Sequence, residues 1–318
     1  MKKAAFVISS PFQALCALEA KSYYGIDDAT FFLFDTDICH NMVAPFLNKA
    51  GEIRFIEHKK NGTIQLIRKV RKSVKERFEL VFCGDYFSYG IYVVALCISK
   101  YKSQHVYLDD GNSSLEIAPP ISRKRPRSRN ERLWYSVLNL FTKLKAIKSS
   151  LFTIYDLGDN CPMPVIHNSF SSLVSGDDIL RHGIYVIGTN ASKAVFRYKS
   201  YQEYLTAIDG WIKSKYREEE VYYCPHRGDH NDWSSFIDSL GWKMFETEIS
   251  VEIDFVHKGL YPVGVFGFGS TALLTLKMIY PDSDVKTIVA EYASESDNRS
   301  YRRIEEYYLK YDIHPINL

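Results

Sequence analysis

The sequence predicts two α/β domains, each built on a parallel sheet with helices on both faces. The chain has 318 residues, which is too long for one ordinary core and suits two domains of roughly 150 residues each. Short β-rich runs alternate with longer helical stretches in both halves, as is typical of a parallel α/β sheet. This alternation breaks once in the middle of the chain, so the join between the domains is expected near residues 158 to 183.

The first half contains five predicted strands and four predicted helices before the break. Apolar residues at alternating or helical spacing define these elements. The expected strands are 4–8, 30–34, 53–57, 80–83 and 105–108, and the expected helices are 11–21, 42–50, 64–78 and 91–100. A basic loop, an amphipathic helix over 131–148 and a strand over 151–155 follow. We assign residues 1–157 to a Rossmann-like N-terminal domain.

The second half returns to the same alternation after residue 184. The expected strands are 185–187, 221–224, 243–245, 263–266 and 286–289, and the expected helices are 201–215, 233–240, 253–258, 270–278 and 299–311. We assign residues 158–318 to a second Rossmann-like domain. Its last helix is a candidate for packing back on the N-terminal domain.

The composition is that of a globular protein with no general attraction to nucleic acid. Hydrophobic residues make up 46% of the chain, charged residues 25%, and the net charge is +2. The six cysteines are scattered without a C-x-x-C pair, which indicates buried thiols in a reducing compartment and neither a disulfide framework nor a zinc site. The apolar run 4–8 is strand-length, too short for a signal peptide or a membrane span. A cytoplasmic protein is therefore expected.

Two adjacent carboxylates, Asp109 and Asp110, and Gly111 follow the strand predicted at 105–108. Ligands of open parallel sheets bind beyond the carboxyl ends of the strands. Successive side chains of an extended segment point in opposite directions, so one carboxylate is expected to face a cleft and the other to support the turn. The alternative is an Asp-Gly turn with solvated acids.

His226 and Arg227 follow the strand predicted at 221–224, directly after Pro225. A histidine can donate a proton or a hydrogen bond to a leaving phosphate near neutral pH, and an arginine can hold a phosphate or carboxylate in a fork. The alternative is a structural loop histidine. Gly188, after the strand at 185–187, marks a further loop on the same side by position.

The strand predicted over 263–266 is followed by two glycines, Gly267 and Gly269, and then by Ser270 and Thr271 at the start of a helix. Free backbone amides, two hydroxyls and the positive end of a helix dipole suit a phosphate, although Ser270 can also serve only as the helix N-cap. The sequence lacks the G-x-x-x-x-G-K-[ST] pattern of P-loop ATPases. It also lacks a G-x-G-x-x-G at the first helix, which disfavours a dinucleotide oxidoreductase.

Together, the Asp-Asp-Gly, Pro-His and Ser-Thr motifs resemble, in this order and span, those of the bacterial sialyltransferases, including the lipooligosaccharide sialyltransferases and bacterial polysialyltransferases. The opening Ser10-Pro11-Phe12-Gln13-Ala14-Leu15 also resembles the first strand-loop-helix of that family. The resemblance covers most of the chain, although each motif is short. One departure is that the proline precedes His226, whereas in the family it usually follows the histidine.

The resemblance implies a GT-B fold, in which two Rossmann-like domains face a cleft, and a metal-independent, inverting sialyltransferase. It implies that Asp110 is the general base, with Asp109 as the alternative. It further implies that His226 acts on the departing phosphate, that Ser270 and Thr271 hold that phosphate, and that an acid such as Glu252 grips the ribose. The donor would be CMP-sialic acid and the acceptor a galactose-terminated glycan of bacterial surface polysaccharide or lipopolysaccharide. No cofactor is expected.

Other interpretations of the sequence stay open. Asp35-Thr36-Asp37 is a D-x-D after a strand, which metal-dependent transferases use, although a loop turn is the simpler reading. Another donor, such as CMP-Kdo or a UDP-hexose, or a non-catalytic binding protein of the same fold would also fit. The basic segment 123–148, in which Glu131 is the sole acid, can contact anionic lipid at the inner face of the membrane or an anionic glycan, or form a solvated loop and an ordinary helix. No motif supports nucleic-acid binding.

Overall fold

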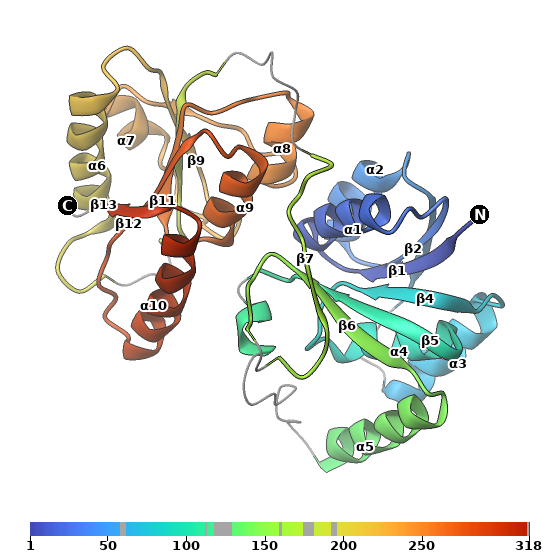
Figure 1. Ribbon diagram of the computed structural model, residues 1–318. Helices are drawn as coiled ribbons and strands as arrows, with labels where there is room; N and C mark the ends of the chain where they lie inside the picture. Colours follow the sequence, from blue (N-terminus) through green and yellow to red (C-terminus); the bar gives the residue numbers. More distant parts are fainter. Residues whose placement is uncertain are drawn as a thin grey trace. The chain divides into compact units, whose positions relative to one another are not determined.

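The computed structural model describes residues 1–57, 62–111, 113–117, 129–158, 161–173, 181–191, 196–316 and 318. The chain divides into two compact units, Met1–Ser172 and Leu173–Leu318. Each unit has its own parallel sheet with helices around it (Figure 1). The predicted fold class, two parallel α/β domains, is therefore confirmed. The first unit runs to residue 172, within the expected join, so residues 158–172 belong to it.

The first unit is built on a seven-stranded sheet whose neighbouring strands are parallel. The strands are β1 (Lys3–Ile8), β2 (Asp28–Phe34), β3 (Glu52–Ile56), β4 (Phe78–Cys83), β5 (Ser99–Leu108), β6 (Lys148–Thr153) and β7 (Val165–His167). Their order in the sheet is β3-β2-β1-β4-β5-β6-β7. Strands β2 and β3 lie on one side of β1 and strands β4 to β7 on the other, so the strand order reverses between β1 and β4. Sheets of this kind bind ligands at the carboxyl ends of the strands beside such a reversal.

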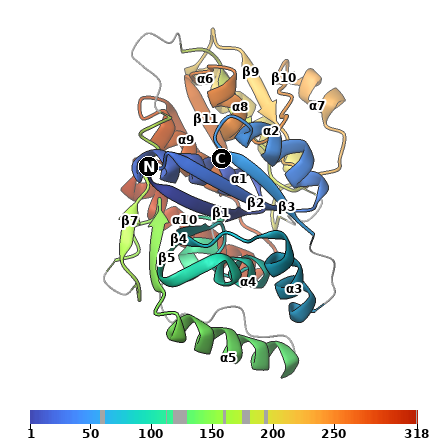
Figure 2. The ribbon, with the colours of Figure 1, turned by 90° about the vertical axis from the view of Figure 1, so that its right-hand side faces the viewer.

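Helices cover both faces of this sheet. They are α1 (Pro11–Tyr23), α2 (Ala44–Leu47), α3 (Thr63–Ser73), α4 (Tyr89–Ile98) and α5 (Arg129–Leu144), with a π-helical segment (Cys39–Val43) before α2 and a 3-10 turn (Ser113–Ile117) after β5. Figure 2 shows α1 and α2 on one face and α3, α4 and α5 on the other. Ser10 caps α1 by accepting a hydrogen bond from Gln13 N–H at 3.3 Å. The first turn of α1 therefore lies directly at the carboxyl end of β1.

Three phenylalanines on neighbouring strands form the centre of the first core. Phe6 of β1 pairs in register with Phe31 of β2 and with Phe82 of β4. The Phe6 ring stacks on the other two at centroid distances of 4.9 and 4.4 Å. All three are fully buried, as expected for central strands of a sheet covered on both faces.

The second unit is built on a six-stranded parallel sheet in the order β10-β9-β8-β11-β12-β13, which reverses between β8 and β11. Its strands are β8 (Ile184–Ile187), β9 (Val221–Cys224), β10 (Lys243–Met244), β11 (Gly264–Phe268), β12 (Asp284–Ile288) and β13 (His314–Ile316). Its helices are α6 (Tyr201–Lys215), α7 (Ser234–Ser239), α8 (Val251–His257), α9 (Thr271–Ile279) and α10 (Glu295–Lys310). In each sheet, therefore, the loops at the carboxyl ends of the two strands beside the reversal mark the expected ligand site.

Several predicted helices end before the expected residue, and the difference is largest for two of them. The helix predicted over 64–78 ends at Ser73, because Phe78 pairs with Ser99 and begins β4. The helix predicted to extend to residue 148 ends at Leu144, because Ala146 has a positive φ of 52° that stops the helix. In both places the apolar spacing continued past the point where the backbone changes direction.

Two short strands were not predicted, and two elements have the predicted bounds. β7 and β13 each contain three residues, too few to show a period of two. α6 and β9 begin and end where expected. For α6 the reason is a capping box, in which the side chains of Ser200 and Glu203 each accept a hydrogen bond from the other residue's backbone N–H.

Candidate active site

Asp109 directly follows β5 and is completely buried. Its Oδ1 accepts a hydrogen bond from Thr153 Oγ1 at 2.6 Å, and its Oδ2 accepts one from Ile154 N–H at 2.8 Å. Burial raises the pKa of Asp109 to about 6, although both hydrogen bonds stabilise the charged form. Asp109 therefore joins the ends of β5 and β6 and is shielded from any bound molecule.

Asp110 is partly exposed, and Gln13 orients its carboxylate. Gln13 Nε2 donates to Asp110 Oδ1 at 2.8 Å. Gln13 Oε1 accepts from Ser9 N–H at 2.7 Å, so the amide must present its NH2 group to the carboxylate. Gly111 reverses the chain with a φ of 62°, and Ser113 Oγ donates to the Asp110 carbonyl at 2.7 Å. Asp110 is therefore a fixed carboxylate at the accessible edge of the sheet.

Gly84, the residue after β4, makes room for Gln13. A Cβ at this position would lie 2.3 Å from Gln13 Oε1 and 2.7 Å from its Cδ. Gln13 is 2% exposed and hydrogen-bonded at both ends of its amide, so it has little freedom to move aside. The ends of β1, β4 and β5 therefore meet at this one amide, beside the reversal in strand order.

We expect Gly84→Ala to lower the free energy of unfolding by about 1–3 kcal/mol, because the added methyl group overlaps a buried, hydrogen-bonded side chain. Gly210→Ala is the matched control, since a Cβ there meets nothing within 4 Å. It lies inside α6, where alanine should stabilise by roughly 0.5–1 kcal/mol. Chemical denaturation followed by circular dichroism measures both. Equal effects of the two substitutions would contradict the packing of Gln13 against Gly84.

In the second unit, His226 occupies a turn after β9. Asp229 N–H donates to the His226 carbonyl at 2.8 Å, and Gly228 N–H donates to His226 Nδ1 at 3.0 Å. Because Nδ1 is an acceptor, the neutral ring carries its proton on Nε2. The side chain is exposed. The turn therefore presents an N–H donor at the carboxyl edge of the second sheet.

The loop after β8 packs against this turn. A Cβ on Gly188 would lie 2.6 Å from Tyr223 Oη, and a Cβ on Gly228 would lie 2.9 Å from Asn190 Nδ2. Within the described parts of the chain, Asn190 Oδ1 is buried and has no hydrogen-bond partner. A buried acceptor in this state costs free energy, and an N–H donor of a bound molecule could satisfy it.

Glu252 lies at the start of α8 and is 7% exposed. Burial raises the pKa of its carboxyl group above the ordinary value, while the positive charge of Arg227 acts in the opposite direction. The structure therefore brings Glu252 within electrostatic range of Arg227, the residue after His226. Arg227 itself is exposed.

Ser270 is the N-cap of α9, and its Oγ accepts a hydrogen bond from Ala272 N–H at 3.2 Å. The cap uses the oxygen as an acceptor, so the hydroxyl proton is still a donor. The Ser270 carbonyl accepts a hydrogen bond from Tyr308 Oη of α10 at 2.8 Å. Gly269 links this cap to β11, and Thr271 is the first residue of the helix. The predicted capping role and a phosphate-binding role are therefore compatible.

The predicted donor-side residues come from four strands that are consecutive in the second sheet. Gly188 follows β8, His226 follows β9, Ser270 follows β11, and Glu252 follows β10 in the next helix. The first-unit pair follows β5. The predicted residues of each unit thus lie at the carboxyl edge of that unit's sheet. Their catalytic roles stay predictions.

The D-x-D sequence forms a local turn. His40 Nε2 lies 2.7 Å from Asp35 Oδ1, and Cys39 N–H donates to Thr36 Oγ1 at 3.3 Å. Across the described residues, no group of three or more histidine, cysteine, aspartate or glutamate side chains is placed to hold a metal ion.

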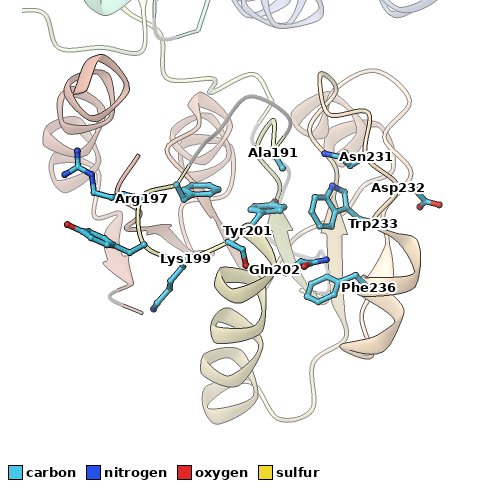
Figure 3. Close-up of a pocket in the computed structure, with 12 residues that line it drawn as sticks. Ala191, Arg197, Lys199, Tyr201, Gln202, Asn231, Asp232, Trp233 and Phe236 are labelled. Carbon is cyan, nitrogen blue, oxygen red and sulfur yellow. The ribbon is translucent and has the colours of Figure 1, made fainter. Parts of the chain in front are cut away.

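An open pocket of ≈ 720 Å³ lies at the starts of α6 and α7 (Figure 3). Tyr201, Trp233 and Phe236 form aromatic parts of its wall, and the Tyr201 and Trp233 rings meet edge to face at 5.0 Å. Trp233 Nε1 donates to Asp229 Oδ2 at 2.8 Å, which ties this wall to the His226 turn. The pocket was not predicted from the sequence, because its aromatic residues lie in segments predicted only as the first turns of two helices.

Gln13 and Asn190 lie in segments that the sequence singled out, but no role was predicted for either side chain. Gln13 belongs to the first turn of a helix that directly follows the first strand, and this position was the available signal. Asn190 follows a strand next to the reversal in the second sheet. Both residues thus lie where ligands of such sheets bind.

The two parallel-sheet units define the GT-B fold. Similar solved structures include an alpha/beta-galactoside alpha-2,3-sialyltransferase from Photobacterium phosphoreum, with a TM-score of 0.59, 10% identity, and coverage of 99% of this chain and 98% of that chain. A sialyltransferase from Photobacterium damsela has a TM-score of 0.58 and 12% identity, with coverage of 100% and 82%.

The same fold occurs in a UDP-N-acetylglucosamine 2-epimerase candidate from Listeria monocytogenes. Its TM-score is 0.56 at 11% identity, with coverage of 98% of this chain and 88% of that chain. No protein-family model and no curated protein matches the sequence. At these identities the likeness establishes the fold, and the reaction must be argued from the residues.

Proposed function

We propose that this protein is an inverting, metal-independent sialyltransferase that transfers sialic acid from CMP-sialic acid to a galactose-terminated acceptor in bacterial surface glycan synthesis. The observation that carries the proposal is the Asp110 carboxylate, which Gln13 and Gly84 hold at the carboxyl edge of the first sheet. The fold shared with two bacterial sialyltransferases supports it.

In the proposed reaction, Asp110 accepts the proton of an acceptor hydroxyl while the hydroxyl oxygen attacks the anomeric carbon of the donor. The bond between that carbon and the phosphate oxygen of CMP breaks, and its electron pair leaves with CMP. Attack opposite the leaving group inverts the configuration. Asp109 has no direct part, because its burial and its bonds to Thr153 and Ile154 give it a structural role.

The second unit is proposed to stabilise the departing phosphate. His226 would donate a hydrogen bond from Nε2–H to the phosphate, and the Ser270 hydroxyl, Thr271 and the first-turn N–H groups of α9 would supply further hydrogen bonds. Gly188 and Gly269 would let the backbone approach the nucleotide, Arg227 would contact anionic groups, and Glu252 would hold the ribose. These donors take the place of a metal ion in the proposal.

The same fold is compatible with two alternative functions. A donor such as CMP-Kdo or a UDP-hexose would use the same base and helix terminus, and the likeness to an epimerase candidate for a UDP-sugar favours testing UDP. A non-catalytic nucleotide- or glycan-binding protein would keep the fold and lack turnover. A lipid-linked acceptor would place the protein at the inner face of the membrane, so cytoplasmic location with peripheral membrane contact is part of the proposal.

Two experiments separate these possibilities. Calorimetric titration with CMP and UDP should show binding of CMP, and incubation with CMP-sialic acid and lactose in excess EDTA should yield a sialylated trisaccharide. Binding of UDP alone would overturn the proposed donor. Loss of product in EDTA that returns with added divalent metal would overturn metal independence, and nucleotide binding without any product would favour the non-catalytic alternative.

A further inference from the structure

Helix α5 packs on the first unit through one of its faces. Leu138 on that face is 3% exposed. Tyr92 Oη of α4 and Thr142 Oγ1 form a hydrogen bond of 2.5 Å, and the rings of Tyr89 and Tyr135 meet at 4.9 Å. These contacts fix which side of α5 faces the protein.

The opposite face of α5 is apolar and exposed. Leu133, Leu140, Phe141 and Leu144 are 64%, 55%, 47% and 63% exposed. Their spacing of seven, one and three residues places them along a single face of a helix. An ordinary surface helix turns its apolar face inward, and a contiguous exposed apolar patch marks an interaction site. We call these four residues the α5 stripe.

The segment that carries the stripe is strongly basic. Residues 119–148 contain nine lysines and arginines and one acid, Glu131. Lys143 and Lys148 are exposed, and Arg123, Lys124, Arg125 and Arg127 precede α5 in the part of the sequence that lies outside the described residues. An exposed apolar face on a segment whose sequence is rich in cations suits the surface of an anionic bilayer, where aliphatic side chains enter the acyl boundary and cations meet the lipid phosphates.

We infer that α5 is a membrane-docking helix, which lies in the interface of an anionic bilayer with the α5 stripe inserted. The described parts of the chain contain no helix that is both long and apolar enough to cross a bilayer. A second copy of the chain is a poorer partner, because a two-fold contact through α5 would bring two identical basic segments together. This inference deepens the membrane contact in the proposed function, but lipid binding needs neither donor nor acceptor.

Sedimentation of the full chain with vesicles tests the inference. Wild type should pellet with vesicles of equal parts phosphatidylglycerol and phosphatidylcholine, pellet weakly with phosphatidylcholine alone, and be released in part by high salt. The double variant Leu140→Gln/Leu144→Gln, which removes apolar surface without changing charge, should bind at least roughly tenfold more weakly. Leu309→Gln is the control, because Leu309 is 60% exposed on α10 and should leave binding unchanged.

The inference is overturned if wild type stays in the supernatant with anionic vesicles, or if the double variant binds as well as wild type. It is also overturned if sedimentation equilibrium shows that the stripe mediates dimers and no lipid binding. Circular dichroism checks that the exposed substitutions leave the fold intact. Because the assay contains no sugar nucleotide, its failure would leave the proposed transfer reaction standing, and failure of transfer would leave lipid binding standing.

Discussion

Asp110→Asn should reduce sialyl transfer about 10³-fold, because an amide cannot take the proton from the acceptor hydroxyl. The fold should survive, since the asparagine Oδ1 still accepts the hydrogen bond that Gln13 Nε2 donates to the carboxylate. Turnover measured with CMP-sialic acid and lactose, together with the thermal midpoint, tests both statements. Asp35→Asn is the control, because Asp35 lies in an exposed turn beside His40. Near-normal turnover of Asp110→Asn would remove Asp110 from the mechanism.

Gln13→Glu gives a second, independent test of Asp110 as the proposed base. It places a carboxyl group where the amide donated to Asp110, and two neighbouring carboxyl groups then share a proton over part of the pH range. The acid limb of the pH–rate profile should move upward by at least about one unit, with activity recovering at higher pH. A purely structural role for Gln13 would lower the rate equally at every pH.

His226→Ala should reduce transfer about 10²–10³-fold, the usual effect of removing one hydrogen-bond donor to developing negative charge. The Nε2 proton defined by the Gly228 bond to Nδ1 is the group that is lost. His230→Ala is the control, because His230 is an exposed histidine of the same loop. Rate measurements at saturating donor separate loss of catalysis from loss of donor binding.

A partial rescue sharpens this test. His226→Gln can place an amide N–H near the position of the imidazole Nε2, so it should retain more activity than His226→Ala. If both variants are equally impaired, an amide N–H at this position does not replace the hydrogen bond from the imidazole Nε2–H. If His226→Ala transfers as fast as His230→Ala, the histidine has no part in the reaction and the resemblance in this motif is accidental.

Much of this arrangement could be predicted from the sequence, because position in a parallel sheet follows from simple alternation. Two adjacent acids after a strand were expected to have different environments, and Asp109 is buried on Thr153 while Asp110 is partly exposed. Ser270 was expected to cap a helix or hold a phosphate, and the cap leaves its hydroxyl proton available. In both cases the prediction needed only the residue's position relative to its own strand or helix.

The remaining features depend on contacts that no local rule contains. Gln13 and Asp110 are 97 residues apart in the chain, and Gly84 matters only because Gln13 lies against it. The early end of the helix predicted over 64–78 follows from pairing of Phe78 with Ser99. The α5 stripe is a further case, since helical spacing shows that an apolar face exists but not which way it points.

The hydrogen bond between Gln13 and Asp110 also bears on how the protein acquires activity during synthesis. Its partners lie on the first helix and after the fifth strand, and β4 lies between β1 and β5 in the sheet, so the pairings of β4 with both strands must be complete before this hydrogen bond can form. Such long-range parallel pairing is slow relative to local helix formation. Asp110, the proposed base, therefore takes its orientation against Gln13 late, when most of the first unit has emerged and assembled. A nascent chain with its early helices formed would still lack this oriented carboxylate.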